Sequence, residues 1–418
     1  MPTIWIVNHY AGGPGIGTGW RHWELGRRWA RQGVRVRIFT ASTRIGGRQC
    51  PNRRGESVQD GVSFRFIPTR EYQGNGVGRA LNMAEFARGS VRAMREAASA
   101  GERPDVIIAS SPQPFMWPGS ARMARLLGAA FVPDIRDAWP ESLRDLAGLG
   151  PLHPLVLASE RALRSALRHA ALVTSPLPNA GLHLREHGFG ALRWLHVPNG
   201  ISLPVGGSAG LPEDARIAIA TARQEGRRVA LYAGAIGVPN ALSDLFEAVR
   251  RLPATCRQRL AFVIAGSGTE VHRLHAASRT AEPASFRFLG EREQTEVQAI
   301  ARACDAGVAL RTAHRVYRFG VSPQKLPMYL ACGLPVIYSS TDPEDPVARD
   351  RLGWWTQAGD VDALSSTVEE FSRISDDHLA ALAERCREHA RTKFDWDRIA
   401  ERCLMALPMR TFRGIGHD

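Results

Sequence analysis

The sequence predicts an α/β protein made of two doubly wound parallel-sheet domains. The chain has 418 residues, of which 44% are hydrophobic and 23% charged, and this is enough for two ordinary globular domains with normal cores. Short apolar or β-branched runs alternate with stretches of helical periodicity, which is the pattern of a parallel sheet covered by helices. The alternation stops once, at a stretch rich in Gly, Pro and Ser, and then starts again.

In the first half, the run TIWIVN opens a series of expected strands, and helical periodicity fills several of the gaps between them. The expected strands are residues 3–8, 34–40, 62–67, 105–110 and 131–135, and the clearest expected helices are residues 20–32 and 79–98. Residues 199–214 form the candidate linker. After it the expected strands are residues 228–234, 260–266, 286–290, 306–310 and 334–338.

Several classes of protein are disfavoured by composition. No apolar run reaches the roughly 18 to 20 residues that cross a bilayer, and MPTIWIVNHY has the pattern of a first strand rather than of a leader. We therefore expect a cytoplasmic protein. The six cysteines occur without CxxC spacing, which favours reduced thiols over disulfides or a zinc site.

Positive charge is concentrated in the first half. Residues 1–200 contain 26 arginines and 14 acidic residues, a net charge of +12 out of +13 for the whole chain. An anionic membrane surface, an acidic substrate or a solvated arginine-rich surface would each account for this excess. No basic 5–8-mer, aromatic RNA-binding motif or zinc-finger spacing supports nucleic acid as a partner.

Three glycine-rich loops follow expected strands, at the sheet edge where such folds bind ligands. The first lies in residues 8–22, with five glycines in the eight residues from Gly12 to Gly19, and the others are YAGAIG (232–237) and IAGSGTE (264–270). Such loops can bring backbone N–H groups close to a phosphate, although the first loop alone also fits an ordinary surface loop. The candidate phosphate contacts are Gly15, Gly17, Gly234, Gly237, Gly266 and Gly268.

The order of motifs resembles a known family. The relevant stretches include the glycine-rich start, FVPDIRDAWPESL (131–143), VPNGI (197–201), the two later glycine loops, residues 288–310 and residues 317–340. Together they are similar to family 4 glycosyltransferases with the GT-B fold, and more narrowly to bacterial cell-surface polysaccharide enzymes of the WbuB type.

The resemblance implies two Rossmann-like domains that face each other across a cleft. Residues 1–203 would bind the acceptor, residues 204–392 would bind the nucleotide-sugar, and residues 393–418 would cross back onto the first domain. It also implies sugar transfer with retention of anomeric configuration and without an obligatory metal or other cofactor. The donor would be a UDP-sugar, with a GDP-sugar as the second choice, and the acceptor a saccharide or lipid-linked saccharide in surface polysaccharide synthesis.

Lys325 is one of only two lysines among 54 basic residues. Its helix is expected to begin near Ser322 or only at Pro327, because a proline is tolerated in a first helical turn. A lysine near a helix N-terminus is repelled by the dipole unless an anion lies between them. Lys325 is therefore the candidate cation for the leaving diphosphate, unless it is simply an exposed lysine.

The sequence departs from the family at the ribose ligand. Relatives usually carry an acidic residue where this chain has Met328, and a thioether cannot accept a charge-assisted hydrogen bond. The ribose would then be held by backbone groups or by Tyr329 and Ser322, or the donor would bind differently or weakly. The remaining predicted nucleotide contacts are Pro323, beside Ser322, and Leu289 and Gly290, which would contact the base through backbone atoms.

In the first half, the candidate catalytic residues are His9, Arg136 and Asp137, with Glu141 in the same DIRDAWPES segment. Asp137 could act as a general base or orient sugar hydroxyls, or it could cap the turn and pair with Arg136. Arg136 stands where many relatives have a histidine near the reacting sugar. His9 is either a sugar ligand or a packed histidine.

Two further segments have predicted roles. DWD (395–397) has a metal-diphosphate spacing, but its place after RTKF favours the start of the last helix, so no metal ligands are predicted. Residues 155–170 place Arg161, Arg164 and Arg168 on one helical face beside an apolar run, which predicts peripheral binding to the anionic inner face of the cytoplasmic membrane.

Two rival functions stay open. A nucleotide-sugar 2-epimerase shares the two-domain fold, although the segments DIRDAWPES and SPQKLPMYLACG favour a transferase. A binding protein with impaired donor affinity is the other rival, because Met328 removes an expected ligand. The sequence does not determine the oligomeric state.

Overall fold

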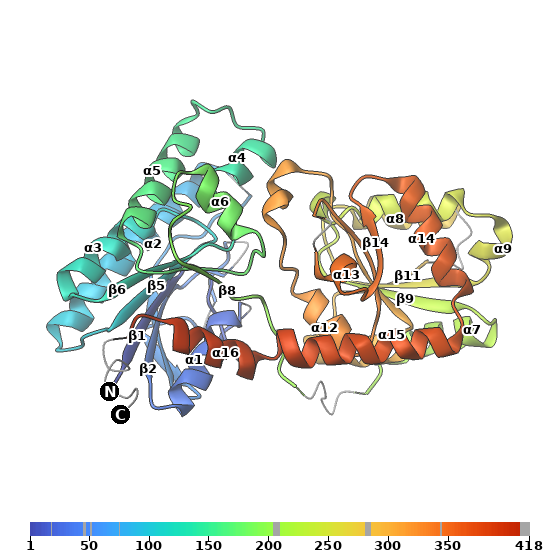
Figure 1. The fold of residues 1–418 in the computed structure, drawn as a ribbon, viewed down its shortest axis with the longest axis horizontal. Coiled ribbons are helices and arrows are strands. Elements are labelled where there is room, and N and C mark those ends of the chain that lie inside the picture. The colour runs from blue at the N-terminus through green and yellow to red at the C-terminus, as the bar shows by residue number, and fades with distance from the viewer. Residues whose placement is uncertain are drawn as a thin grey trace. The chain divides into compact units, whose positions relative to one another are not determined.

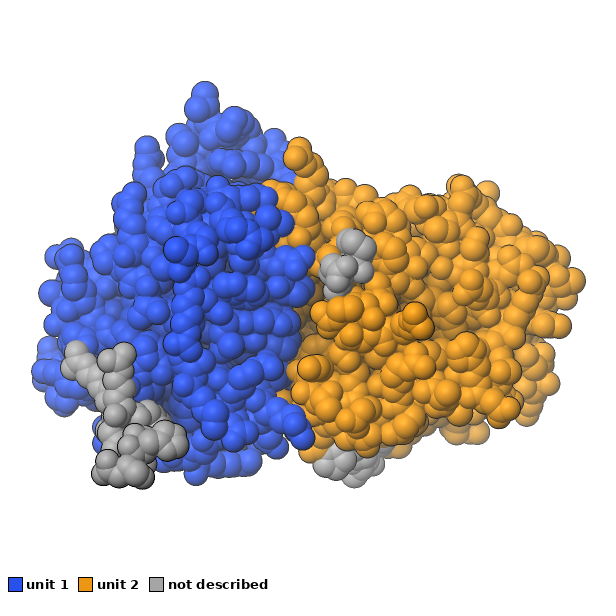
Figure 2. All heavy atoms as spheres, in the orientation of Figure 1, with its two compact units in different colours: residues 1–198, 396–418 blue, residues 199–395 orange. Residues whose placement is uncertain are grey.

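The computed structural model describes residues 1–17, 19–44, 47–50, 52–74, 76–203, 210–280, 286–342 and 345–409. Contacts divide the chain into two compact units, residues 1–198 with 396–418 and residues 199–395 (Figure 2). Residues 204–209 of the candidate linker lie outside the described part. No helix in that part combines the length and hydropathy needed to cross a bilayer.

Unit 1, residues 1–198 with 396–418, contains an eight-stranded sheet in the order β3-β4-β2-β1-β5-β6-β7-β8. All neighbouring strands are parallel except β3, which pairs antiparallel with β4. The strands are β1 Thr3–Asn8, β2 Arg35–Ala41, β3 Glu56–Gln59, β4 Val62–Ile67, β5 Val106–Ser110, β6 Ala130–Asp134, β7 Val173–Ser175 and β8 Trp194–His196.

Helices cover both faces of this sheet (Figure 1). Along β1, Ile4 and Ile6 pack with α1 and α16, whereas Trp5 and Val7 pack with α2, α3 and α5 on the opposite face. Such two-sided burial is expected of a central parallel strand. The helices are α1 Arg21–Arg31, α2 Val77–Ser99, α3 Trp117–Leu127, α4 Glu141–Asp145, α5 Pro154–His169, α6 Ala180–Glu186 and α16 Trp396–Ala406.

The last helix, α16, lies beside α1. The indole Nε1 of Trp29 donates to the backbone oxygen of Ala400 at 2.8 Å, and Arg28 forms an ion pair with Asp397. The DWD segment therefore places Asp397 in the first turn of α16, where its carboxylate is paired with an arginine.

Unit 2, residues 199–395, contains a six-stranded, fully parallel sheet in the order β11-β10-β9-β12-β13-β14. Along β9, Val229 and Leu231 pack into one core, and Ala230 and Tyr232 into the core on the other face. The strands are β9 Arg228–Ala233, β10 Leu260–Ala265, β11 Phe286–Gly290, β12 Ala306–Ala309, β13 Val336–Ser340 and β14 Gly353–Gln357.

The helices of unit 2 also lie on both faces of their sheet (Figure 1). They are α7 Glu213–Gln224, α8 Leu242–Arg251, α9 Ala254–Arg257, α10 Val271–Thr280, α11 Gln294–Ala303, α12 Lys325–Ala331, α13 Pro346–Arg349, α14 Val361–Arg373 and α15 Asp376–His389, with the short turns η1 Val238–Asn240, η3 Arg315–Phe319 and η4 Ala390–Phe394. The predicted fold class, with two doubly wound parallel sheets, is confirmed.

Candidate functional site

Three strand-end loops of unit 2 are joined by backbone hydrogen bonds. The N–H of Gly234, after β9, donates to the oxygen of Ala265 at 2.9 Å, and the N–H of Ile236 donates to Ser267 at 2.8 Å. The N–H of Gly266, after β10, donates to Gly290 at the end of β11, at 2.7 Å. The two glycine loops and the end of β11 thus form one layer at the carboxyl edge of the sheet.

Glycine is required where these loops touch. A Cβ on Gly266 would lie 1.9 Å from the oxygen of Gly234, and one on Gly268 would lie 2.2 Å from the oxygen of Ile236. No side chain could be accommodated there without separating the two loops. These two glycines are therefore needed for the close approach of the loops. This need is independent of any ligand contact made by the N–H groups of the loops that are not already hydrogen-bonded.

Lys325 reaches this layer from the first residue of α12. Its Nζ lies 3.8 Å from the ring centroid of Tyr232, the penultimate residue of β9. The same Nζ would be 3.3 Å from a Cβ on Gly234. The lysine and the first of the two glycine loops are thus direct neighbours, as expected if both contact one anion.

The environment of Lys325 disfavours its charge. Part of the side chain still reaches solvent, but the surrounding protein desolvates the ammonium, and Arg311 repels it. Together these effects lower the pKa of Lys325 from 10.5 to about 7. Arg311 itself follows β12, and its guanidinium donates to the side chain of Asn240 at 2.7 Å. An anion near both cations would offset their repulsion.

The start of α12 is held by the VPNGI segment. The backbone N–H of Asn199 donates to Oγ of Ser322 at 3.1 Å, and its Nδ2 donates to the backbone oxygen of Ser322 at 2.7 Å. The N–H of Leu326 then donates to Pro323 at 3.2 Å. The helix begins at Lys325, between the two predicted starts at Ser322 and Pro327, and Pro327 lies in its first turn.

Met328 and Tyr329 do not form the expected ribose site. Met328 packs in the core of unit 2. Tyr329 is fully buried, and its hydroxyl accepts the N–H of Ala233 at 2.7 Å, which ties α12 to the end of β9. Burial raises the pKa of Tyr329 well above its ordinary value. The prediction of a direct contact between Tyr329 and the ribose is therefore wrong, because no part of this side chain is accessible.

The other predicted nucleotide contacts lie near the same edge. The side chain of Leu289 is buried in the core, so only its backbone could meet a base. Gly290 ends β11, and its carbonyl already accepts a hydrogen bond from Gly266. Gly237 precedes η1, and a Cβ there would lie 3.7 Å from Oγ1 of Thr269. Their contacts with a nucleotide stay predictions.

In unit 1, the loop containing Gly15 and Gly17 forms a closed turn. The N–H groups of Ile16 and Gly17 donate to the oxygen of Gly13 at 3.0 and 3.2 Å, so neither is directed outward to a phosphate. The buried Arg53 fixes the loop by donating from Nε to the oxygen of Ile16 at 3.0 Å. The proposed phosphate contact of Gly17 would therefore require this turn to open.

His9 is a packed histidine. Its ring is fully buried between those of Tyr10 and Phe86, with centroid distances of 4.3 and 4.4 Å. Burial lowers the pKa of His9 to about 3, so the imidazole is neutral near pH 7. Of the two interpretations of His9, the structure supports packing over contact with a sugar.

Asp137 and Arg136 follow β6 in a turn that is held from the neighbouring strand β5. The N–H of Arg136 donates to Oγ of Ser111 at 2.8 Å. The side chain of Asp137 is exposed, but the surrounding protein desolvates its carboxylate and raises its pKa, while Arg136 opposes the rise. The role of this carboxylate as a general base or as a ligand of sugar hydroxyls stays a prediction.

The turn is supported by a residue that the sequence did not single out. Asp134, the last residue of β6, accepts hydrogen bonds from Ser110 at 2.7 Å and from Thr174 at 2.9 Å. Arg21 and His22 of α1 also face this buried carboxylate, at 3.7 and 3.8 Å, and they hold its pKa well below the usual range. The sequence feature that could have indicated this role is the presence of a charged residue within the otherwise apolar expected strand FVPDI.

The sequence also missed Tyr232 and Asn199 as site residues. Tyr232 supplies the ring under Lys325, and Asn199 holds Ser322. Tyr232 belongs to the motif YAGAIG and Asn199 to the motif VPNGI. A polar or aromatic residue close to a glycine at the end of an expected strand would have indicated both.

This architecture matches solved glycosyltransferases. Sucrose-phosphate synthase from Thermosynechococcus elongatus is 17% identical with a TM-score of 0.71, and the match covers 97% of this chain and 98% of that chain. Anabaena HepE in complex with UDP-glucose is 16% identical with a TM-score of 0.64 over 97% and 100% of the two chains. WaaG, a glycosyltransferase involved in lipopolysaccharide biosynthesis, is 15% identical with a TM-score of 0.65 over 96% and 98%. The fold is GT-B.

Family models match both halves of the chain. Residues 16–200 match the glycosyl transferase 4-like domain, and residues 214–393 match glycosyl transferases group 1. The chain is therefore a glycosyltransferase of the GT4 type. No curated protein sequence matches it significantly.

Proposed function

We propose that this glycosyltransferase moves a sugar from a UDP-sugar to a saccharide or lipid-linked saccharide acceptor in the synthesis of a bacterial surface polysaccharide. The observation that carries the donor assignment is the position of Lys325 at the start of α12, against Tyr232 and the first glycine loop of unit 2. HepE with bound UDP-glucose and WaaG, with its role in lipopolysaccharide biosynthesis, support the choice of donor and pathway.

In this proposal, Lys325 neutralises the charge that forms on the leaving diphosphate. The bond between the anomeric carbon and the β-phosphate oxygen breaks while the acceptor oxygen bonds to that carbon from the same face. Lys325, Arg311 and the backbone N–H groups of the loops supply positive charge and dipoles to the departing UDP. We propose that transfer therefore needs no metal ion.

Unit 1 would supply the acceptor side. Asp137 would orient the acceptor hydroxyl or take up its proton, and the leaving phosphate is the other group that could receive it. Arg136, the preceding residue in the same turn, opposes the rise in the pKa of Asp137. Replacing this carboxylate should slow transfer without weakening donor binding.

A lipid-linked acceptor would bring unit 1 to the inner membrane surface. Arg161, Arg164 and Arg168 lie exposed on α5, but the apolar face of that helix, including Leu163 and Leu167, is buried in unit 1. The apolar run beside the arginines therefore cannot insert into lipid, and any membrane binding at α5 would be electrostatic. Arg164 is paired with Glu160, which leaves Arg161 and Arg168 as the main contributors.

The function is tested with a panel of UDP- and GDP-sugars and lipid-linked acceptors. Transfer from a UDP-sugar, with release of UDP and a retained anomeric centre in the product, supports the proposal. An epimerised donor without transfer would instead identify the 2-epimerase alternative. Donor binding with neither reaction would identify a binding protein. Performing the assay with and without EDTA tests the metal independence of transfer.

A further inference from the structure

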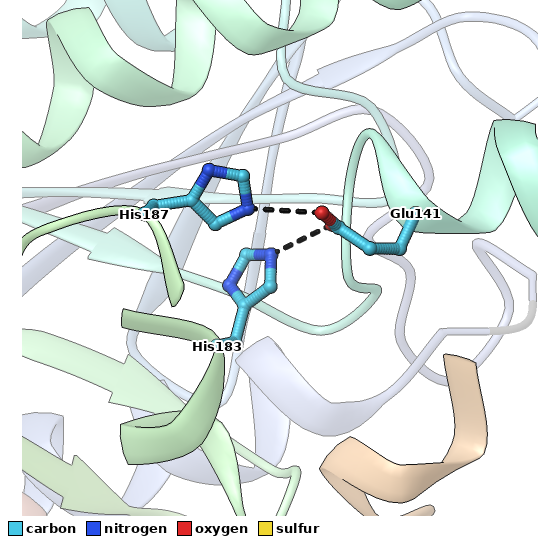
Figure 3. Close-up of side chains that lie close together, drawn as sticks. All are labelled: Glu141, His183 and His187. Carbon is cyan, nitrogen blue, oxygen red and sulfur yellow. Dashed lines mark hydrogen bonds and ion pairs between the residues drawn. The ribbon is translucent and has the colours of Figure 1, made fainter. Parts of the chain in front are cut away.

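The side chains of three residues of unit 1 converge on one another: Glu141, His183 and His187 (Figure 3). Nε2 of His183 lies 3.0 Å from Oε2 of Glu141, and Nε2 of His187 lies 3.0 Å from Oε1 of the same carboxylate. One donor atom from each residue lies within 4.8 Å of the other two. Both imidazoles therefore present the same nitrogen toward one carboxylate.

Two separate elements form this cluster. His183 lies in α6 and His187 at its C-cap, four residues apart, so both side chains leave the same face of the helix. Glu141 is the first residue of α4 and lies in the DIRDAWPES segment. The HxxxH spacing is visible in the sequence, but the carboxylate is contributed from about 40 residues earlier in the chain.

A second carboxylate orients His187. Nδ1 of His187 lies 3.2 Å from Oε1 of Glu160 in α5, and Arg164 donates to that same oxygen at 2.6 Å. Once the proton on Nε2 has been displaced by a metal ion, a proton on Nδ1 shared with Glu160 would orient the lone pair of Nε2 toward that ion. A carboxylate behind a ligating histidine is the usual outer contact of histidine-bound metal ions.

We propose that Glu141, His183 and His187 bind a divalent transition metal ion, with Zn²⁺ as the best fit. Zn–N and Zn–O bonds of about 2.0 to 2.2 Å place tetrahedral donors roughly 3.3 Å apart. The 3.0 Å between each Nε2 and its carboxylate oxygen is close to this spacing. Two imidazoles and one carboxylate suit Zn²⁺, Co²⁺ or Ni²⁺ and disfavour Mg²⁺ and Ca²⁺, which prefer oxygen ligands.

The burial of the cluster fits a bound ion with one open position. The side chains of His183 and His187 are 1% and 7% exposed, and that of Glu141 is 12% exposed. The exposed edge of Glu141 would admit the ion and a water molecule as fourth ligand. Each Nε2 must be deprotonated to coordinate, so binding would release the protons that otherwise lie between nitrogen and carboxylate.

The ion would tie α6 to the segment that carries Asp137. Glu141 follows Asp137 by four residues, so coordination would stiffen the candidate acceptor loop without touching the reacting atoms. This metal site does not rest on the proposed function. The proposed diphosphate chemistry at Lys325 involves no metal ion.

The test uses the full chain without a histidine tag, stripped with EDTA and then freed of chelator. Titration with ZnCl₂ should give one equivalent bound per chain, release of protons and a rise in Tm, and CoCl₂ should give visible absorption bands of a four- or five-coordinate site. His187→Gln should abolish this binding, and Glu160→Gln, which removes only the outer carboxylate, should weaken it about tenfold.

The matched control is the double variant His272→Gln/His275→Gln, which removes two exposed histidines three residues apart on α10. It should keep the full stoichiometry and affinity. Circular dichroism and a cooperative thermal unfolding transition verify that each variant is folded, and His183→Gln replaces His187→Gln if the latter is not. The proposal is overturned if the stripped chain binds no Zn²⁺ at about 100-fold excess, or if binding survives both histidine variants of the cluster, or if only the α10 control loses it.

Discussion

The ammonium of Lys325 lies 3.8 Å from the ring centroid of Tyr232, so the first residue of α12 is placed over the end of β9. This contact links the two parts of the candidate donor site that the sequence separates by more than 90 residues. The ring stabilises a cation that desolvation and Arg311 otherwise disfavour. An anion that binds beside Lys325 would therefore raise its pKa and favour its protonated form.

Binding of UDP should be accompanied by proton uptake. With a pKa of about 7, most of Lys325 is neutral at pH 8, and a diphosphate beside it would raise that pKa. Isothermal titration calorimetry in two buffers of different ionisation enthalpy should show uptake of up to about one proton per UDP at pH 8. Lys325→Met should lose the uptake and most of the affinity, whereas Lys393→Met, at an exposed lysine, should change neither. Binding enthalpies that agree in both buffers would contradict this assignment.

The same lysine should make stability depend on pH. Its folded-state pKa of about 7 is below the ordinary 10.5, so between these values the unfolded chain binds more protons and the free energy of unfolding rises with pH. Below pH 7 the buried charge is present and its cost is complete. Lys325→Met should therefore raise Tm by a few degrees at pH 6.5, which corresponds to about 1 kcal/mol in the free energy of unfolding. The rise in Tm should be smaller at pH 9.5. An equal shift at both pH values would rule out titration of Lys325 as the cause.

Met328→Glu should destabilise the protein instead of restoring a ribose ligand. Met328 packs in the core of unit 2, and a carboxylate there would lose hydration without a partner. We expect a loss of more than about 2 kcal/mol in thermal or denaturant unfolding, with no gain in UDP affinity. Met328→Leu, which keeps the apolar volume, is the control and should remain near wild type. Tighter UDP binding by Met328→Glu would show that the side chain reaches the nucleotide after all.

Tyr329→Phe should affect folding more than donor binding. The change leaves the N–H of Ala233 without its acceptor in a buried position, which costs about 1 to 3 kcal/mol. Chemical denaturation measures this loss, and calorimetry should find UDP affinity changed less than about threefold at a temperature where the variant is folded. A large loss of affinity with unchanged stability would reinstate Tyr329 as a nucleotide ligand.

Asp137→Asn should lower kcat for transfer by about 10² or more while leaving UDP affinity unchanged, because it removes a proton acceptor and no donor contact. The control is Asp60→Asn, at an exposed turn of the same unit with a φ of 48° that asparagine tolerates. Equal rates for the two variants would exclude Asp137 from catalysis.

Charge reversal on α5 should weaken binding to anionic vesicles. Arg161→Glu/Arg168→Glu removes two exposed arginines that have no acidic partner in the described part of the chain. Co-sedimentation at low salt should fall at least tenfold, since each arginine near the surface contributes about 1 kcal/mol. Arg31→Glu/Arg95→Glu, at exposed positions on α1 and α2, is the charge-matched control. Equal sedimentation with neutral and anionic vesicles would remove the membrane hypothesis.

The sequence by itself determined ten of the fourteen described strands and the positions of the glycine loops, and it limited where α12 could begin. Each expected strand is present within two residues of its expected bounds, because apolar runs between turn residues are local signals. The strands it missed are β3, β7, β8 and β14, and β7 and β8 are only three residues long, too short to show a period. Pro327 limited where α12 could begin, because a proline is tolerated only in the first turn.

Only the tertiary structure decided which side chains face the site. In the seven-residue helix α12, the side chains of Lys325 and Tyr329 are one turn apart. Lys325 contacts the ring of Tyr232 beside the glycine loop, whereas Tyr329 is buried and accepts a hydrogen bond from Ala233 at the end of β9. His9 follows its strand as a ligand would, but Phe86 from α2 covers its ring. The partners of Glu141 lie about 40 residues away. Such contacts depend on how distant segments pack, and no local pattern in the chain encodes that packing.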